Sequence, residues 1–360
     1  MENNKKTAYI RGFIILISLL VAITGISFAI STLEEEEEPE MVNLEVVTER
    51  YLIPGGQSIG VKMDVKGVLV VGLEEIETIT GERVNPGLMC GLQIGDTIVE
   101  INDQKVYRAK EVQKLVNDIK GDIALKIMRK DEIKEVHLTP VIAKEDKMYK
   151  LGVWVKDKTA GIGTLTFYDP ETKQYGALGH AITDPETGAV LSVAEGELVN
   201  SKVESVKQGK AGEPGEIRGI FYEAEAPLGT LDKNSEQGIF GKIYEDISNP
   251  MFEKPIPIGK KDTIKEGPAL ILTTLDNNEI ESYEIEIEKI NVHDKDSNKN
   301  MTIKVTDDRL LEASGGIVQG MSGSPIIQDG KLVGAVTHVL VNDPTRGYGI
   351  FIENMLEAAK

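Results

Sequence analysis

Apolar and polar positions divide the chain into one continuous apolar stretch near its start and two longer regions of short periodic patterns. Residues 12–33 contain no charged side chain, and a helix of this length can cross the hydrocarbon core of a bilayer. Residues 42–141 alternate between strand-like and helix-like patterns, whereas residues from about 149 onward consist mostly of short strand-like runs. These patterns predict a mainly β protein that follows a transmembrane helix.

Charges on either side of the apolar stretch predict its orientation. Lys5, Lys6 and Arg11 precede it and Glu34–Glu38 follow it. Because positive charge stays on the cytoplasmic side, we expect the amino terminus in the cytoplasm and the rest of the chain outside. Residues 1–33 are then a cytoplasmic tail and anchor, and residues 34–50 are an acidic linker. A cleaved signal peptide is the alternative, because Ser27-Phe28-Ala29 has small residues where a signal peptidase cuts.

A small α+β domain is predicted after the linker. Residues 67–72 form an apolar run between glycines, and residues 97–106 alternate like a strand that turns back on itself. Residues 108–119 carry apolar side chains at helical spacing, and Gly121 follows as a helix terminator. Residues 123–129 and 133–138 read as a closing hairpin.

One segment of this region has the signature of a known peptide-binding domain. Residues 85–102, NPGLMCGLQIGDTIVEIN, resemble the core of PDZ domains, which implies a PDZ-like domain over residues 51–142. The resemblance implies that Ser58, Ile59, Gly60 and Val61 form the loop that binds the terminal carboxylate of a peptide, while the peptide adds to the neighbouring strand. The alternative is that the glycines near this loop only make a turn.

Residues 149–360 contain a serine in a turn suited to nucleophilic catalysis. The sequence Gly320-Met-Ser-Gly-Ser-Pro325 places Ser322 between glycines, which permit a tight turn and close approach of a substrate. It resembles the nucleophile loop of chymotrypsin-like serine proteases, which implies a β-barrel peptidase domain. By this resemblance Ser322 attacks, the N–H groups of Gly320 and Ser322 bind the oxyanion, and Thr337-His338-Val339 is the strand on which the substrate lies. Met321 stands where those enzymes carry an acidic residue.

A nucleophilic serine needs a general base, and the chain has four histidines. His137 lies in the predicted closing hairpin and His293 in a charged loop, so neither is favoured. His338 has apolar neighbours and is interpreted as structural. His180 lies among small residues at the end of a strand and precedes the serine, as it does in chymotrypsin-like enzymes. We therefore predict His180 as the base.

The third member of a triad is left open by spacing alone. Asp184 is followed by Pro185 and is interpreted as turn chemistry. Asp232 stands at about the histidine-to-aspartate spacing of chymotrypsin-like enzymes, and Asp307 lies fifteen residues before Ser322.

The order of anchor, PDZ-like domain and catalytic domain resembles the stage IV sporulation protein B serine peptidases, as do Leu178-Gly-His-Ala-Ile182, Val305-Thr-Asp307 and the Ser322 turn. The resemblance implies a triad of His180, Asp307 and Ser322. It also implies that the protein acts between the forespore and mother-cell membranes, where it cleaves itself and a partner in a membrane complex that regulates processing of a late sigma factor. An inert membrane-anchored scaffold that recruits peptide C-termini is the alternative.

Composition excludes several other functions. The formal net charge of −19 argues against nucleic-acid binding, and the single Cys90 excludes an internal disulfide or a cysteine-rich metal centre. The acidic loop at residues 294–305 lacks the glycine and the glutamate of a calcium loop. We expect no cofactor and no metal.

Overall fold

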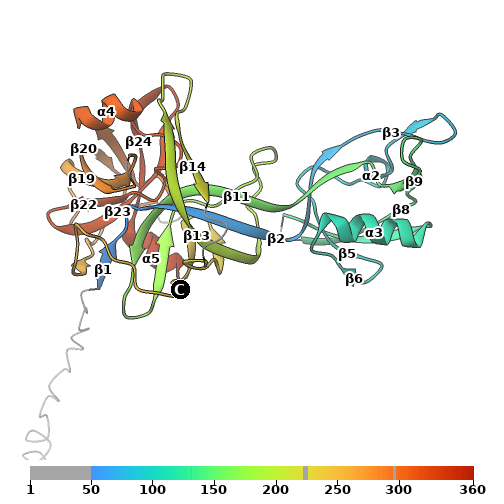
Figure 1. Ribbon diagram of the computed structural model, residues 1–360, viewed down its shortest axis with the longest axis horizontal. Coiled ribbons are helices and arrows are strands. Elements are labelled where there is room, and N and C mark those ends of the chain that lie inside the picture. The colour runs from blue at the N-terminus through green and yellow to red at the C-terminus, as the bar shows by residue number, and fades with distance from the viewer. Residues whose placement is uncertain (1–49, 131, 222–225, 277, 295–296) are drawn as a thin grey trace, which may run out of the picture. The chain divides into compact units, whose positions relative to one another are not determined.

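The computed structural model describes residues 50–360 except 131, 222–225, 277 and 295–296 (Figure 1). The predicted anchor and acidic linker lie outside the described residues. Within the described part, no helix is both long and apolar enough to cross a membrane. Most described elements are strands, which confirms the predicted mainly β class.

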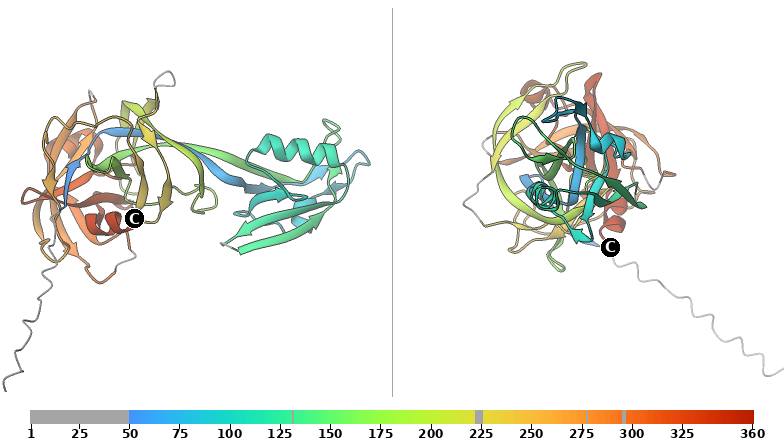
Figure 2. Two further views of the ribbon diagram at one scale, coloured as in Figure 1. Left: turned by 90° about the horizontal axis from the view of Figure 1, so that it is seen from below. Right: turned by 90° about the vertical axis from the view of Figure 1, so that its right-hand side faces the viewer.

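Two long strands run through two different parts of the molecule. Strand β2 (Ser58–Leu73) pairs antiparallel with β11 (Val153–Tyr168) along almost its whole length (Figure 2). The first half of β2 also pairs with β13 (Val193–Lys207), whereas its second half pairs with β5 (Thr97–Ile101). Residues 66–157 therefore lie between the first half of β2 and the second half of β11, and these two half-strands belong to another sheet. Residues 66–157 are here called the inserted lobe.

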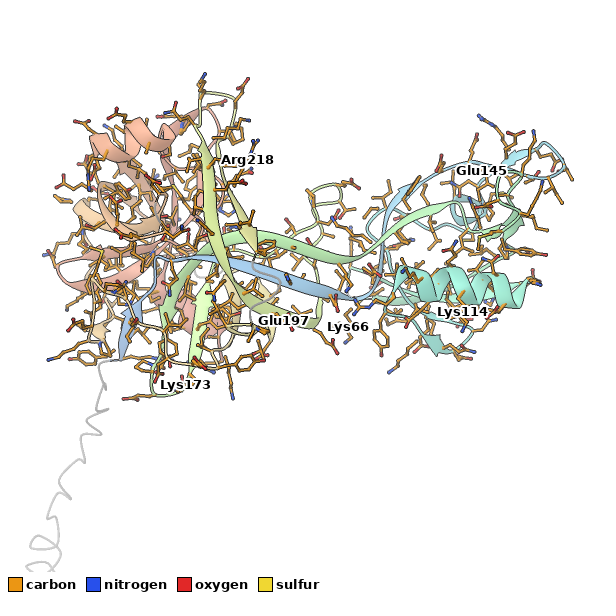
Figure 3. All side chains as sticks on the ribbon, viewed as in Figure 1. Lys66, Lys114, Glu145, Lys173, Glu197 and Arg218 are labelled. Atoms are coloured by element: carbon orange, nitrogen blue, oxygen red, sulfur yellow. The ribbon has the colours of Figure 1, made fainter. Side chains whose placement is uncertain are left out.

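The inserted lobe contains a small sheet and helix α3 (Ala109–Ile119). Val112 and Val116 on α3 are buried, whereas Lys114 is exposed on its outer face (Figure 3). Hairpin β7–β8 spans Ile123–Arg129 and Glu132–Leu138, close to the predicted bounds. The remaining elements are β3 (Ile76–Glu77), β4 (Arg83–Val84), α2 (Pro86–Met89), β6 (Gln104–Lys105), β9 (Val141–Ile142) and β10 (Tyr149–Lys150).

The second half of β11 and the first half of β2 belong to a sheet here called the open sheet. Its buried side chains include Ile59, Leu165 and Tyr175, which are fully covered. The other strands of the open sheet are β1 (Tyr51–Pro54), β12 (Gln174–Ala177), β14 (Glu216–Phe221), β15 (Gly229–Thr230), β16 (Lys233–Ser235), β17 (Gly238–Lys242) and β18 (Ile256–Pro257).

Six further strands form a closed barrel in the order β19-β20-β21-β24-β23-β22. Alternating apolar residues such as Ile285, Ile287 and Ile303 fill its interior. Helix α4 (Asp308–Ser314) follows β21, and helix α5 (Ile352–Ala358) follows β24. The strands are β19 (Gly267–Thr274), β20 (Ile280–Ile290), β21 (Met301–Val305), β22 (Pro325–Gln328), β23 (Lys331–Leu340) and β24 (Asp343–Phe351).

Strand pairing corrects two predictions about the region after the linker. Strand β1 pairs with β11 and β18, and the start of β2 pairs with β13, so residues 51–65 belong to the open sheet rather than to the inserted lobe. The boundary predicted at Tyr51 is therefore too early. The predicted carboxylate loop of Ser58, Ile59, Gly60 and Val61 is also wrong, because these residues lie mid-strand between β11 and β13. With a strand paired on each side, they form no open loop to receive a carboxylate.

Candidate active site

Ser322 lies in a tight turn just before β22. Gly320 and Gly323 on either side have φ values of +98° and +96°, a conformation that glycine adopts without strain. A Cβ on Gly323 would lie 2.1 Å from the carbonyl oxygen of Thr164 and 2.5 Å from the backbone nitrogen of Leu178. Gly323 is therefore required both for the turn and for its close approach to the open sheet.

Hydrogen bonds fasten this turn to the open sheet and to the barrel. The carbonyl of Ser322 accepts from Thr164 N at 2.9 Å, and the carbonyl of Gly320 accepts from Thr164 Oγ1 at 2.8 Å. Gly323 N donates to Val336 O at 2.8 Å on β23. These bonds hold the serine between the two sheets.

Met321 stands where an acidic residue is expected, and its side chain packs the turn against the barrel core. It is fully buried in the barrel core, and its Sδ accepts from Val318 N at 3.4 Å. The turn is thus held by apolar burial, where an acidic side chain would need a buried cationic partner.

Two N–H groups of the turn are available to a ligand. Met321, Gly323 and Ser324 donate their backbone N–H groups to carbonyl oxygens. Across the described residues, the N–H groups of Gly320 and Ser322 have no hydrogen-bond acceptor. These are the two groups predicted to bind the oxyanion.

His180 follows β12 through two residues with left-handed backbone. Leu178 and Gly179 have φ values of +67° and +70°, and a Cβ on Gly179 would lie 2.9 Å from Thr337 Cγ2. This turn carries His180 away from the strand, and the Nδ1 of His180 lies 2.8 Å from the carbonyl oxygen of Ala181. A carbonyl only accepts, so Nδ1 carries the proton and Nε2 keeps its lone pair.

Burial also keeps His180 in the form that a base requires. Desolvation lowers the pKa of His180 below its usual value, so the imidazole is neutral at pH 7. Asn234 fixes the chain beyond it: its Oδ1 accepts from Ile182 N, and its Nδ2 donates to Ile182 O and to Leu191 O, each at 2.8 Å. Sequence reasoning missed Asn234, because its partners are distant in the chain.

His338 is a second histidine in the site, although its position on a strand predicts a structural role. Its ring centroid lies 5.0 Å from that of His180, and its buried Nδ1 has no hydrogen-bond partner within the described part of the chain. Burial, followed by the neighbouring His180 and Lys299, lowers the pKa of His338 to about 4. His338 is therefore neutral and lies beside the base. In the sequence, its place next to Thr337 on the predicted substrate strand indicates that it lies near the site.

Ser322, His180 and His338 line one cleft of about 660 Å³ between the open sheet and the barrel. Gly320 and Thr337 contribute to the same cleft. The hydroxyl of Ser322 donates to Thr337 O at 2.8 Å on the predicted substrate strand. Ser322 and His180 thus share the cleft, but in this state the hydroxyl is bound to the strand and not to the base.

The structure does not bring Asp307 to His180. Asp307 is the N-cap of α4: its Oδ1 accepts from Arg309 N at 2.9 Å and its Oδ2 from Glu284 N at 3.2 Å. Hydrogen bonding from the Arg309 guanidinium holds the pKa of this carboxylate below its usual value. These contacts are those of a helix cap in the barrel, and a catalytic role of Asp307 stays a prediction that the geometry does not support.

The other two aspartates also lie outside the catalytic arrangement. Asp232 is exposed and lines a different cavity, beside Tyr175 and Lys360. Asp184 is buried and accepts from the backbone N–H groups of Glu186 and Thr187, which confirms its interpretation as turn chemistry.

A glycine-flanked serine and a neutral histidine in one cleft, in a chain of this fold, define a serine peptidase. The model of the SpoIVB peptidase S55 family matches residues 147–356, more than half of the chain. The chain therefore belongs to the SpoIVB peptidase family, as its sequence motifs predict. The matched residues leave out β1 and β2, which nevertheless complete the open sheet.

Solved structures of other proteases show a weaker likeness. The active form of the Rv3671c protease from M. tuberculosis is 13% identical, with a TM-score of 0.33, over 55% of this chain and 72% of that one. The HtrA-type protease AlgW with a tripeptide is 14% identical, with a TM-score of 0.32, over 55% of this chain and 54% of that one. No curated protein sequence matches the chain.

Proposed function

We propose that this serine peptidase is a membrane-tethered signalling endopeptidase of sporulation. It cleaves itself and a partner protein in a membrane complex, and this cleavage activates intramembrane processing of a late sigma factor. Family membership supports the setting, and the charge-flanked apolar residues 12–33 support a single anchor with the catalytic part outside the cytoplasm. By this proposal the protein acts between the forespore and mother-cell membranes.

The shared cleft of Ser322 and His180 is the observation that carries the peptidase chemistry. Ser322 Oγ adds to the carbonyl carbon of the scissile bond while its proton passes to Nε2 of His180. The N–H groups of Gly320 and Ser322 stabilise the negative charge on the carbonyl oxygen. The imidazolium then gives its proton to the leaving amine, and water releases the acyl group by the reverse steps.

Substrate binding to β23 would complete this arrangement. The Ser322 hydroxyl now donates to the carbonyl of Thr337, a group that a substrate paired with the strand would engage. A substrate N–H donated to this carbonyl displaces the hydroxyl, which can then turn toward His180. Binding of the correct peptide therefore favours the active rotamer of the nucleophile.

The inserted lobe supplies a second site for peptides. A groove of about 390 Å³ lies between α3 and residues 149–155, lined by apolar side chains such as Val112, Val116 and Trp154. A groove between a helix and a strand suits an extended peptide. This groove replaces the loop predicted at residues 58–61, and we propose that it holds a substrate, a regulator or another part of the chain.

The test compares wild-type protein with Ser322→Ala, both full-length in membranes, after incubation with candidate membrane partners. Fragments are identified by mass spectrometry. Wild type should cleave the partner and itself, with self-cleavage in the acidic linker between Glu34 and Tyr51, and Ser322→Ala should do neither. Undiminished processing by Ser322→Ala refutes the proposal.

The groove in the inserted lobe also favours a second candidate, an inert scaffold that recruits peptide C-termini. Labelling with a serine-directed fluorophosphonate separates the two functions. Labelled Ser322 supports the peptidase, whereas a folded protein that binds peptides but takes no label supports the scaffold.

A further inference from the structure

Strand β11 carries residues of two different sites. Residues 149–155, which lead into this strand and form its start, line the groove of the inserted lobe. Residues 159–162, farther along the same strand, line the catalytic cleft that contains Ser322 and His180. One strand therefore connects the groove to the cleft.

One edge of β11 is open between the two sites. Residues 153–164 pair with β2 on one edge, and no strand of the described part of the chain pairs with their other edge, here called the free edge. Thr164 shows where this edge faces. Its N–H donates to Ser322 O at 2.9 Å and its carbonyl accepts from Leu178 N at 3.3 Å. The free edge therefore faces the nucleophile turn.

Alternation along the strand extends the free edge through the cleft. Residues 158–164 keep one continuous register with β2. Because successive residues of a strand direct their N–H and C=O groups to opposite edges, Ala160 and Ile162 share the direction of Thr164. Ala160 is exposed, and a Cβ on the neighbouring Gly161 would meet no atom within 4 Å. The backbone groups of Ala160 and Ile162 are therefore open to an added strand.

The same edge continues in the groove of the inserted lobe. The carbonyl of Gly152 accepts from the N–H of Glu74, the residue after β2, at 3.0 Å. Gly152 thus directs its carbonyl toward β2, and Val153, the next residue, directs its backbone groups away from β2. Since Val153 lines the groove, a peptide in the groove can pair with the free edge there as well.

The far end of the groove suits the free C-terminus of a chain. Asn117 of α3 closes this end: its Oδ1 accepts from Tyr149 N at 2.9 Å, and its Nδ2 donates to Tyr149 O at 3.3 Å. Leu151 and Gly152 line the groove beside this closure, and their N–H groups have no acceptor among the described residues. Gly152 has a φ of +74°, and successive N–H groups in such a turn bind anions such as a carboxylate.

The chemistry sets the direction of a substrate along this edge. The leaving amine has to stay near His180, which follows β12 of the open sheet, so the residues after the scissile bond lie on the side of β11. Val153 and Ile162 are nine positions apart, which corresponds to about 30 Å of strand. The register with β2 shifts once in this interval, between Lys156 and Lys158.

We propose that one substrate chain occupies the cleft and the groove at the same time. Its scissile bond lies at Ser322, the following residues add to the free edge of β11 as an antiparallel strand, and its free C-terminus binds in the groove. The peptidase then prefers a bond about ten to fourteen residues before the C-terminus of a substrate. This proposal rests on the proposed function, and self-cleavage in the acidic linker, far from the C-terminus at Lys360, does not use the groove.

The test uses a peptide pool and full-length protein in detergent. Peptides of about 25 residues, long enough to span both sites, have a randomised sequence and end in valine, because apolar side chains line the groove. They are offered as free acids and as C-terminal amides, and mass spectrometry identifies the cut bonds. Wild type should cut the free acids mostly about ten to fourteen residues from the end, and should cut the amides about tenfold more slowly.

Cuts spread evenly along the peptides overturn the proposal, as do equal rates for acids and amides. Methylation of the peptide backbone provides a matched control. In the best-cut peptide, every second N–H group is methylated over about six residues after the scissile bond, in either of the two alternating phases. Only alternate residues of an added strand donate to residues 158–162, so one phase should slow cleavage about tenfold and the other should not. Equal effects of both phases refute strand addition.

Binding tests the proposal without catalysis. Fluorescence anisotropy compares the affinity of Ser322→Ala for a peptide of about 15 residues that ends in valine and for only its last five or so residues. The longer peptide should bind about tenfold more tightly, because its additional residues donate to the free edge. Equal affinities refute the proposal even if no peptide is cut, as does a wild type that takes the fluorophosphonate label but cuts no peptide. A wild type that takes no label instead refutes the serine chemistry, so the two failures are distinguishable.

Discussion

Substitution of Gly323 by alanine tests how the nucleophile turn is held against the open sheet. The added Cβ would lie 2.1 Å from Thr164 O and 2.5 Å from Leu178 N, and both are backbone atoms that cannot swing aside. The φ of +96° adds strain for any residue with a Cβ. We expect about 1–2 kcal/mol from the left-handed backbone and about 1–3 kcal/mol from overpacking, a total loss of about 2–5 kcal/mol in unfolding free energy.

Gly330 provides a matched control in the turn between β22 and β23. It also has a positive φ, of +72°, but a Cβ there would meet no atom within 4 Å. Gly330→Ala should therefore lose only the backbone contribution of about 1–2 kcal/mol. The difference between the two variants isolates the clash with Thr164 on β11 and with Leu178.

The assay is urea unfolding followed by far-UV circular dichroism, which reports the strands, combined with fluorophosphonate labelling of Ser322. The single Trp154 lies in the inserted lobe, so its fluorescence reports whether that lobe stays folded in both variants. Gly323→Ala should unfold at lower urea than Gly330→Ala and should take less label. Equal losses in the two variants would refute the claim that close backbone approach fixes the turn.

Three further outcomes are expected. Ser322→Ala should abolish labelling yet cost only about 1 kcal/mol in urea unfolding, because the hydroxyl makes one hydrogen bond, to Thr337 O; a much larger loss would contradict this view. The folded-state pKa of His338, about 4, lies below the unfolded value of 6.5, so the contribution of His338 to stability is present above pH 6.5 and is lost as pH falls toward 4. His338→Phe should therefore flatten the curve of unfolding free energy against pH between these values. An unchanged slope in this variant would contradict the lowered pKa. Asp307→Asn should keep the cap of α4 and lose less than about 1 kcal/mol of unfolding free energy, whereas Asp307→Ala should lose about 1–2 kcal/mol. A loss of fluorophosphonate labelling in folded Asp307→Asn would instead support the catalytic role that the family resemblance implies.

Local signals in the sequence are sufficient for the elements that short segments specify. The spacing of Val112 and Val116 predicts α3, and the two strand-like runs at residues 123–129 and 133–138 predict hairpin β7–β8, because each element is stabilised largely by neighbours in sequence. The Ser322 turn is predictable for the same reason, since its flanking glycines encode the backbone conformation that the serine needs.

Pairing between distant segments is what the sequence does not reveal. The sequence predicts a loop at residues 58–61 and an apolar run at residues 67–72, but both belong to the single strand β2. The first half of β2 pairs with β13, its second half pairs with β5, and both halves pair with β11. A strand pattern records which faces are buried, not which strands lie at its edges. The predicted domain boundary and carboxylate loop are therefore wrong at residues whose strand partners lie about a hundred or more positions away in the sequence.

The sequence by itself determined the chemistry, through Ser322, His180 and the family to which their motifs belong. Only the tertiary structure decided what surrounds them: His338 lies beside the base, and Asp307 caps a helix in the barrel. The physical reason is that a nucleophile turn is a local conformation, whereas the charge and burial around a base arise from strands that meet only when the two sheets have folded.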